Sequence, residues 1–180
     1  SINWGRLLPQ IVYYFSAYMQ LVKKGDIQFG DAIDFTVPTG NFGNILAGWF
    51  AREMGLPIGK LVCASNANDV LDEFIQTGVY NANRPFLKTN SPSMDILVSS
   101  NLERFLYFMS EGDGKAVEGY MQALKQDGKY SVPEEVVARM KAVLDSGAVD
   151  EAGTLKVIGD IFKETGYLLD THTAIAVSVA

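Results

Sequence analysis

The chain has 180 residues, of which 48% are hydrophobic and 20% are charged, and its formal net charge is −6 at pH 7. This length and apolar content suffice to bury one sizeable core, so we expect a single domain. Because the charge is negative and no run of Lys or Arg occurs, the composition argues against nucleic acid or an anionic membrane as a partner.

Metal and disulfide chemistry have few candidate residues. Cys63 is the single cysteine and His172 the single histidine. One cysteine excludes an intramolecular disulfide, and the pair lacks zinc-ligand spacing, so we predict no metal site and a reducing, cytoplasmic setting. No segment approaches the ~20 apolar residues of a membrane span, and the N-terminus has no signal-peptide pattern, so we predict a soluble protein.

The first half of the sequence follows a βαβ pattern. Apolar residues recur every three or four positions from 5 to 24, which predicts an amphipathic helix ended by Gly25. Alternation and short apolar runs predict two strands, and helical spacing predicts two further helices. In chain order these are a strand at 32–37, a helix at 45–54, a strand at 60–64 and a helix at 70–76.

The second half is predicted to be mostly helical. Residues 80–100 have no sustained period and indicate a long loop with at most one short strand at 96–98. Helices are expected at 102–109, 115–127, 134–146 and 154–164. We therefore predict an α/β fold with a parallel-rich sheet flanked by helices, whose ligands gather at the carboxyl ends of the strands.

A phosphate-binding loop is predicted between the first strand and the second helix, in Pro38-Thr39-Gly40-Asn41-Phe42-Gly43-Asn44. Unpaired N–H groups and the helix dipole favour an anion there, and the glycines let the backbone approach it. Thr39, Asn41 and Asn44 could add side-chain donors, and Asn44 could cap the helix. The spacing fits neither a dinucleotide-binding nor a Walker loop. A plain βα turn remains the alternative.

Six segments in order resemble threonine synthases over essentially the whole chain. The loop itself is similar to their P-[ST]-G-N-F-G-[ND] element. The other segments are Ser1-Ile2-Asn3-Trp4-Gly5-Arg6-Leu7-Leu8, Ala64-Ser65-Asn66-Ala67-Asn68-Asp69, Ser91-Pro92-Ser93-Met94-Asp95-Ile96, Ser99-Ser100-Asn101-Leu102-Glu103-Arg104 and Asp170-Thr171-His172-Thr173-Ala174.

This resemblance implies part of the tryptophan synthase β-subunit-like fold of fold-type-II enzymes, with pyridoxal 5′-phosphate as cofactor. It implies conversion of the small-molecule substrate O-phosphohomoserine and water to threonine and phosphate, with an oligomeric state that stays open. The cofactor-binding residues implied are Thr39, Gly40, Asn41, Phe42, Gly43 and Asn44. The substrate-binding residues implied are Asn3, Asp95, Asn101 and Arg104.

Several of these residues have simpler structural interpretations. Asn3 and Asn101 each precede a predicted helix and could be N-caps. His172 beside Asp170 could transfer a proton, but a structural role is favoured. Another fold-type-II lyase, such as a threonine dehydratase or cysteine synthase relative, and a non-catalytic module that binds a phosphorylated metabolite remain alternatives.

The sequence lacks two elements of the resembled family. The family's Schiff-base lysine lies upstream of the segment that matches Ser1, and its T-A-H-P-x-K element follows the region that ends at Ala180. Lys163 in Phe162-Lys163-Glu164 is a decoy, because a stripe of Leu155, Ile158, Ile161 and Phe162 would turn it toward water. We therefore expect residues 1–180 to be one α/β domain, the large-domain portion of a longer enzyme, that is inactive alone.

Overall fold

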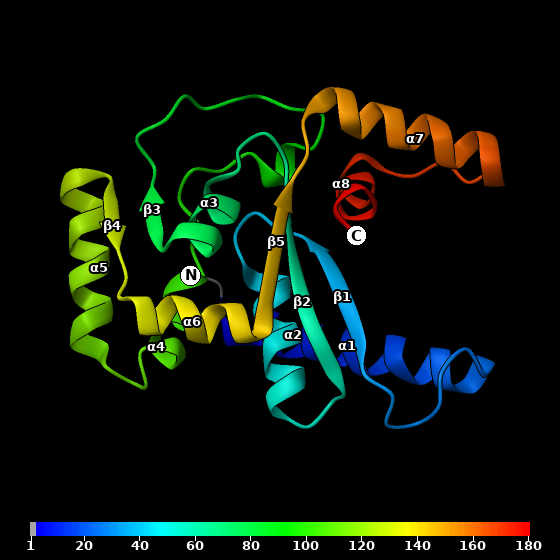
Figure 1. Ribbon diagram of the computed structural model, residues 1–180, viewed down its shortest axis with the longest axis horizontal. Coiled ribbons are helices and arrows are strands. Elements are labelled where there is room, and N and C mark those ends of the chain that lie inside the picture. The colour runs from blue at the N-terminus through cyan, green and yellow to red at the C-terminus, as the bar shows by residue number, and fades with distance from the viewer. Residues whose placement is uncertain (1–2) are drawn as a thin grey trace.

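A three-stranded parallel sheet is the centre of the fold. The computed structural model describes residues 3–180, and Figure 1 shows helices on both faces of the sheet. Its strands are β1 (Ile33–Pro38), β2 (Ile58–Ser65) and β5 (Leu144–Ala148), in the order β1-β2-β5. Because the three strands are parallel, their carboxyl ends meet at one edge.

Alternate residues of the central strand face two different layers. Leu61 and Cys63 belong to the large core, whereas Ala64 packs with Ile175 and Ala176 on the opposite face. The opposite face is covered by α8 (Thr171–Val179). The large core is formed with α1 (Trp4–Lys24), α2 (Gly43–Glu53), α3 (Val70–Thr77), α4 (Leu102–Met109) and α6 (Glu134–Val143).

The remaining elements lie at the periphery. A second sheet of two antiparallel strands pairs β3 (Val79–Asn81) with β4 (Lys129–Ser131). The other helices are the 3₁₀ turn η1 (Pro92–Met94), α5 (Gly114–Asp127) and α7 (Glu151–Thr165). Along residues 3–180, none of these helices has the length and apolarity needed to cross a bilayer.

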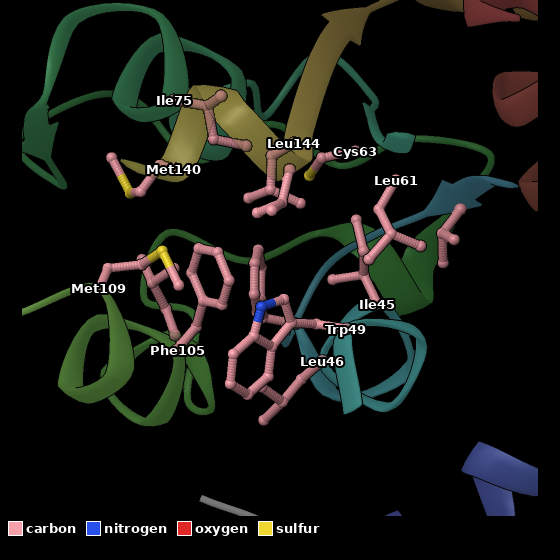
Figure 2. Packing of buried hydrophobic residues seen from close by; sticks show 14 of the residues in the cluster. Ile45, Leu46, Trp49, Leu61, Cys63, Ile75, Phe105, Met109, Met140 and Leu144 are labelled. Carbon is pink, nitrogen blue, oxygen red and sulfur yellow. The ribbon is translucent and has the colours of Figure 1, made fainter. Parts of the chain in front are cut away.

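Aromatic side chains join the helices of the large core (Figure 2). The Trp49 ring of α2 lies 5.8 Å from Phe105 and 4.7 Å from Phe108 of α4, centroid to centroid. Met140 of α6 and Ile75 of α3 close the other side of the cluster. A fully buried side chain of this size contributes roughly 1.5–3 kcal/mol, so this cluster fixes α2 and the loop before it.

Most predicted elements are confirmed within a few residues. Gly25 ends α1 in the left-handed conformation, with φ of 82°, as predicted. The short strand allowed for residues 96–98 does not form, and the β3–β4 pair was not expected. The helix predicted over 134–146 is wrong in its second part, because it ends at Val143. Residues 144–148 form the third parallel strand instead.

The strand β5 is set by packing and not by local propensity. Its sequence Leu144-Asp145-Ser146-Gly147-Ala148 contains residue types that are depleted in strands. A Cβ atom at Gly147 would lie 2.8 Å from Cγ1 of Val179, so the glycine lets α8 approach the sheet closely. Parallel pairing with β2 and cover by α8 outweigh the weak β-propensity of the segment.

Candidate anion-binding site

The loop between β1 and α2 lies at the carboxyl edge of the sheet. Its first residue is tied to the next strand, because Thr39 N donates to Ala64 O at 2.8 Å. Its last residue, Phe42, adopts the left-handed conformation with φ of 60° and ψ of 5°. The buried Phe42 ring lies 5.4 Å from the Phe105 ring, and this burial offsets the strain of a positive φ at a non-glycine residue.

The backbone amides of this loop lack protein acceptors. In the described part of the chain, no acceptor lies within hydrogen-bonding geometry of the N–H groups of Gly40, Asn41, Phe42, Gly43 and Asn44. Native proteins rarely leave so many neighbouring amides unpaired. Together with the positive end of the α2 dipole, five such donors form a site that favours an anion.

These amides line a pocket of about 560 Å³ between the loop and α1. Arg6, Gln10 and Tyr13 face the pocket from α1, since residues at i, i+4 and i+7 share one helix face. Arg6 brings a permanent positive charge to the amides. Sequence reasoning did not assign it a role, although it is the Arg of the segment resembling S-I-N-x-x-R.

Ser93 and Asn101 also line the pocket, and the segment between them packs on the loop. A Cβ atom at Gly40 would lie 2.9 Å from Ser93 O and 3.1 Å from Met94 Cα, so only glycine fits there. Ser99 Oγ donates to Gly40 O at 2.9 Å, and Asn101 Nδ2 donates to Asn41 O at 2.7 Å. Asn101 stands at the N-cap position of α4 but makes no side-chain cap bond.

The polar side chains of the loop make their own contacts. The Thr39 hydroxyl donates to Val37 O at 2.7 Å, and Asn41 Oδ1 lies 3.3 Å from Ser100 Oγ. Asn44 Oδ1 accepts from the Tyr14 hydroxyl at 2.6 Å, and burial raises the pKa of Tyr14. The prediction that Asn44 caps α2 is wrong, because the N-cap residue is Phe42 and no side chain caps this helix.

Asp95 is the centre of a separate polar network. Its carboxylate accepts from Thr89 N, Thr89 Oγ1, Asn66 Nδ2 and Asn68 Nδ2 at 2.7–3.0 Å. Burial alone would raise the pKa of Asp95, but these hydrogen bonds lower it below its ordinary value. Asp95 does not line the 560 Å³ pocket; it holds segment 87–95 against the end of β2. Its predicted substrate role stays a prediction.

Two other predicted substrate residues lie outside the pocket wall. The Asn3 carboxamide accepts from Gly5 N at 2.7 Å, which makes Asn3 the N-cap of α1. Arg104 Cζ stacks over the Trp4 ring at 5.5 Å from its centroid. Neither residue is among those that line the pocket in the described chain, and their substrate roles stay predictions.

Neither His172 nor Lys163 lines the pocket. His172 Nδ1 lies 3.5 Å from Asp170 Oδ1, in the first turn of α8, where Asp170 caps the helix. Lys163 is exposed on α7, although Leu155 and Phe162 of the predicted stripe are exposed as well. Within residues 3–180, no group of three or more His, Cys, Asp or Glu side chains could hold a metal ion.

Comparisons with known proteins find threonine synthases and a threonine-synthase-like protein. Threonine synthase-like 1 of Homo sapiens is 46% identical over 181 residues, covering 100% of this chain and 24% of that protein. Threonine synthase of Pseudomonas aeruginosa is 44% identical over 182 residues, covering 100% and 37%. A scan against models of protein families finds no match.

The fold is shared with solved threonine synthases. The PLP-bound threonine synthase from Brucella melitensis superposes with a TM-score of 0.94 at 44% identity, covering 100% of this chain and 38% of that chain. This chain thus spans between about a quarter and two fifths of the relatives it matches. In sequence and in fold the chain is similar to a segment of these threonine synthases.

Proposed function

We propose that this chain supplies the phosphate-binding cradle for pyridoxal 5′-phosphate in a threonine-synthase-like lyase. The observation that carries the proposal is the row of five amides from Gly40 to Asn44, which have no acceptor within residues 3–180. The Brucella melitensis relative, a threonine synthase solved with PLP bound, supports the same cofactor here.

A phosphate monoester fits the chemistry of the pocket. Its oxygens are strong acceptors that match several converging N–H donors, and its negative charge is favoured at the N-terminal end of α2. Gly40 lets the loop pack closely against Ser93 and Met94, and Arg6 faces the same pocket. A volume of about 560 Å³ leaves room beyond a single phosphate group.

The proposed reaction converts O-phosphohomoserine and water to threonine and phosphate. Bound pyridoxal phosphate would supply the electron sink for elimination and water addition. In this chain the loop amides would orient the cofactor through its phosphate, and Gln10 and Tyr13 would bound the space next to it. The guanidinium of Arg6 would offer a fork of donors to a phosphate dianion.

No lysine lines the pocket in residues 3–180. We therefore propose that the anchoring lysine belongs to the part of the relatives that this chain does not match. By this proposal residues 1–180 form one α/β domain, the large-domain portion of the enzyme, and the cytoplasm is its compartment because Cys63 is buried and unpaired.

A second candidate is a non-catalytic module that binds a phosphorylated metabolite. It is favoured by the composition of the pocket, whose ionisable lining residues in the described chain are Arg6 and Tyr13. The human relative carries the name "threonine synthase-like 1" and not that of an enzyme with a stated activity. Turnover by a longer polypeptide that contains this segment would distinguish the two candidates.

A binding experiment tests the cradle directly. We would titrate the ¹⁵N-labelled chain with inorganic phosphate and with pyridoxine 5′-phosphate, which has no aldehyde to react with surface lysines. Amide signals of residues 40–45 should shift first, and Gly43→Val should weaken binding because a branched side chain obstructs the approach of the ligand. Shifts elsewhere, with residues 40–45 unmoved, would refute the cradle. An assay of the chain for threonine formation should give no turnover.

A further inference from the structure

Two side chains outside the loop bond to its carbonyl groups. Ser99 Oγ donates to Gly40 O at 2.9 Å, and Asn101 Nδ2 donates to Asn41 O at 2.7 Å. Both side chains are at least nine-tenths buried, with exposures of 8% for Ser99 and 0% for Asn101. Buried hydrogen bonds of this kind are shielded from competing water.

Peptide planarity converts these contacts into a constraint on the amides. In a trans peptide the C=O of one residue and the N–H of the next point in opposite directions, and the described chain contains no cis peptide bond. Holding Gly40 O therefore fixes the direction of Asn41 N–H. Holding Asn41 O fixes the direction of Phe42 N–H in the same way.

The alternative orientation would reverse the chemistry of the loop. If either peptide turned over, a carbonyl oxygen would replace an N–H group on the side away from residues 99–101. A carbonyl carries a partial negative charge and repels a phosphate oxygen, so one turned peptide removes a donor and adds a repulsion. Glycine at position 40 lowers the barrier to such a turn because it has no Cβ.

We propose that Ser99 and Asn101 are positioning residues that hold the peptides 40–41 and 41–42 with their N–H groups directed toward the anion. The proposal rests on the proposed function of the loop. It assigns Asn101 a role through the backbone, whereas the sequence had suggested direct contact with substrate. Ser99 had no assigned role in the sequence.

Hydrogen bonds through Tyr80 hold Ser99 in place. Ser99 N donates to the Tyr80 hydroxyl at 2.9 Å, and that hydroxyl donates to Leu97 O at 3.0 Å. The Tyr80 ring is stacked on Tyr130 with centroids 5.2 Å apart. The β3–β4 pair thus supports the segment that orients the loop, although it lies far from the loop in sequence.

The test uses Ser99→Ala and Asn101→Leu in the ¹⁵N,¹³C-labelled chain, with Ser100→Ala as the matched control. Ser100 Oγ lies 3.3 Å from Asn41 Oδ1 and 3.4 Å from Asn101 Nδ2, and it bonds to neither loop carbonyl. Without ligand, Ser99→Ala should shift the carbonyl carbon of Gly40 and the amide of Asn41, and Asn101→Leu those of Asn41 and Phe42. Affinity for pyridoxine 5′-phosphate should fall about tenfold in each variant, and Ser100→Ala should change it less than about twofold.

The outcomes separate this proposal from the cradle itself. If the unsubstituted chain binds pyridoxine 5′-phosphate at residues 40–45 but Ser99→Ala alters neither those signals nor the affinity, the positioning role is wrong and the cradle stands. If the unsubstituted chain shows no binding at these residues, the proposed function fails, while the ligand-free carbonyl shifts still test the orientation. If Asn101→Leu fails to fold, the pair Ser99→Ala and Ser99→Thr decides the question. Ser99→Thr keeps the hydroxyl and should restore binding.

Discussion

Two loops follow neighbouring strands of the same sheet, and they differ in what fills them. After β1, the amides of residues 40–44 have no acceptor within residues 3–180 and lie beside a pocket. The loop after β2, residues 66–69, is occupied by segment 84–95 of the same chain. There Asn68 exchanges hydrogen bonds with both backbone groups of Leu87, at 2.9 and 3.0 Å, and Asp69 pairs with Arg84 at 2.6 Å.

The solvent exposure of the asparagine side chains differs between the two loops in the same way. Asn66 and Asn68 are 1% and 5% exposed, whereas Asn41 and Asn44 are exposed. Both loops lie at the carboxyl edge where ligands gather in α/β sheets, and both are rich in asparagine. The difference teaches that the position of a βα loop permits a ligand site, while the neighbouring chain segments decide whether the site stays open.

The largest effect on stability is expected from removing the Phe42 ring, which holds the loop after β1 in place. Phe42→Ala should lower the free energy of unfolding by about 4 kcal/mol, because the fully buried ring packs on Phe105. Phe42→Gly should cost roughly 1 kcal/mol less than Phe42→Ala, since only glycine adopts a φ of 60° without strain. Urea unfolding followed by circular dichroism measures both. A glycine variant less stable than the alanine variant would contradict the strain at this residue.

The loop after β2, residues 66–69, should lose stability when Asp95 is replaced. Asp95→Ala removes the acceptor of Thr89 N and one of the two acceptors of Asn68 Nδ2, and should cost about 3 kcal/mol. Asp26→Ala, at an exposed carboxylate, serves as the control and should cost less than about 0.5 kcal/mol. If Asp95→Ala were as stable as the control, the network would contribute nothing.

The pH dependence of the same carboxylate has a defined sign. The hydrogen bonds lower the pKa of Asp95 in the folded protein, so its stabilisation is complete above the unfolded pKa of about 3.9 and is lost as the pH falls through the folded value. The stability difference between the unsubstituted chain and Asp95→Asn should therefore be largest near pH 7 and narrow toward pH 3. A constant difference would exclude this carboxylate as the titrating group.

The sequence predicted what local patterns determine. The stripe of α1, its end at Gly25 and the strand–loop–helix around Pro38 to Asn44 follow from periodicity and glycine placement, and the structure has them. The strand β5 escaped prediction because Leu144-Asp145-Ser146-Gly147-Ala148 becomes a strand only by pairing with β2. The left-handed conformation at Phe42 was likewise hidden, since it depends on a distant partner in the sequence, Phe105.

The sequence predicted the loop of the candidate site but not the residues from other elements that surround the loop. Residues 39–44 were found because their glycines precede a helix. Arg6 and Ser99 were missed because their relevance comes from folding, which brings the first turns of α1 and the segment before α4 beside the loop. Asp95 was assigned to substrate from its resemblance to a family segment, whereas its four hydrogen bonds organise the neighbouring closed loop.

The smallest effect on stability is expected where the two loops are in contact, at Gly40. Ser93, in the segment that closes the second loop, packs on Gly40 of the first, and a Cβ there would meet the Ser93 carbonyl oxygen at 2.9 Å. Gly40→Ala should cost about 2 kcal/mol, because both atoms in the clash are held by backbone. Gly119→Ala is the matched control: nothing lies within 4 Å of its Cβ in the helix α5, so it should stabilise by up to about 1 kcal/mol. The melting temperature should therefore fall in Gly40→Ala and rise in Gly119→Ala. A melting temperature that rises in both variants would mean that the two loops are not in contact through Gly40.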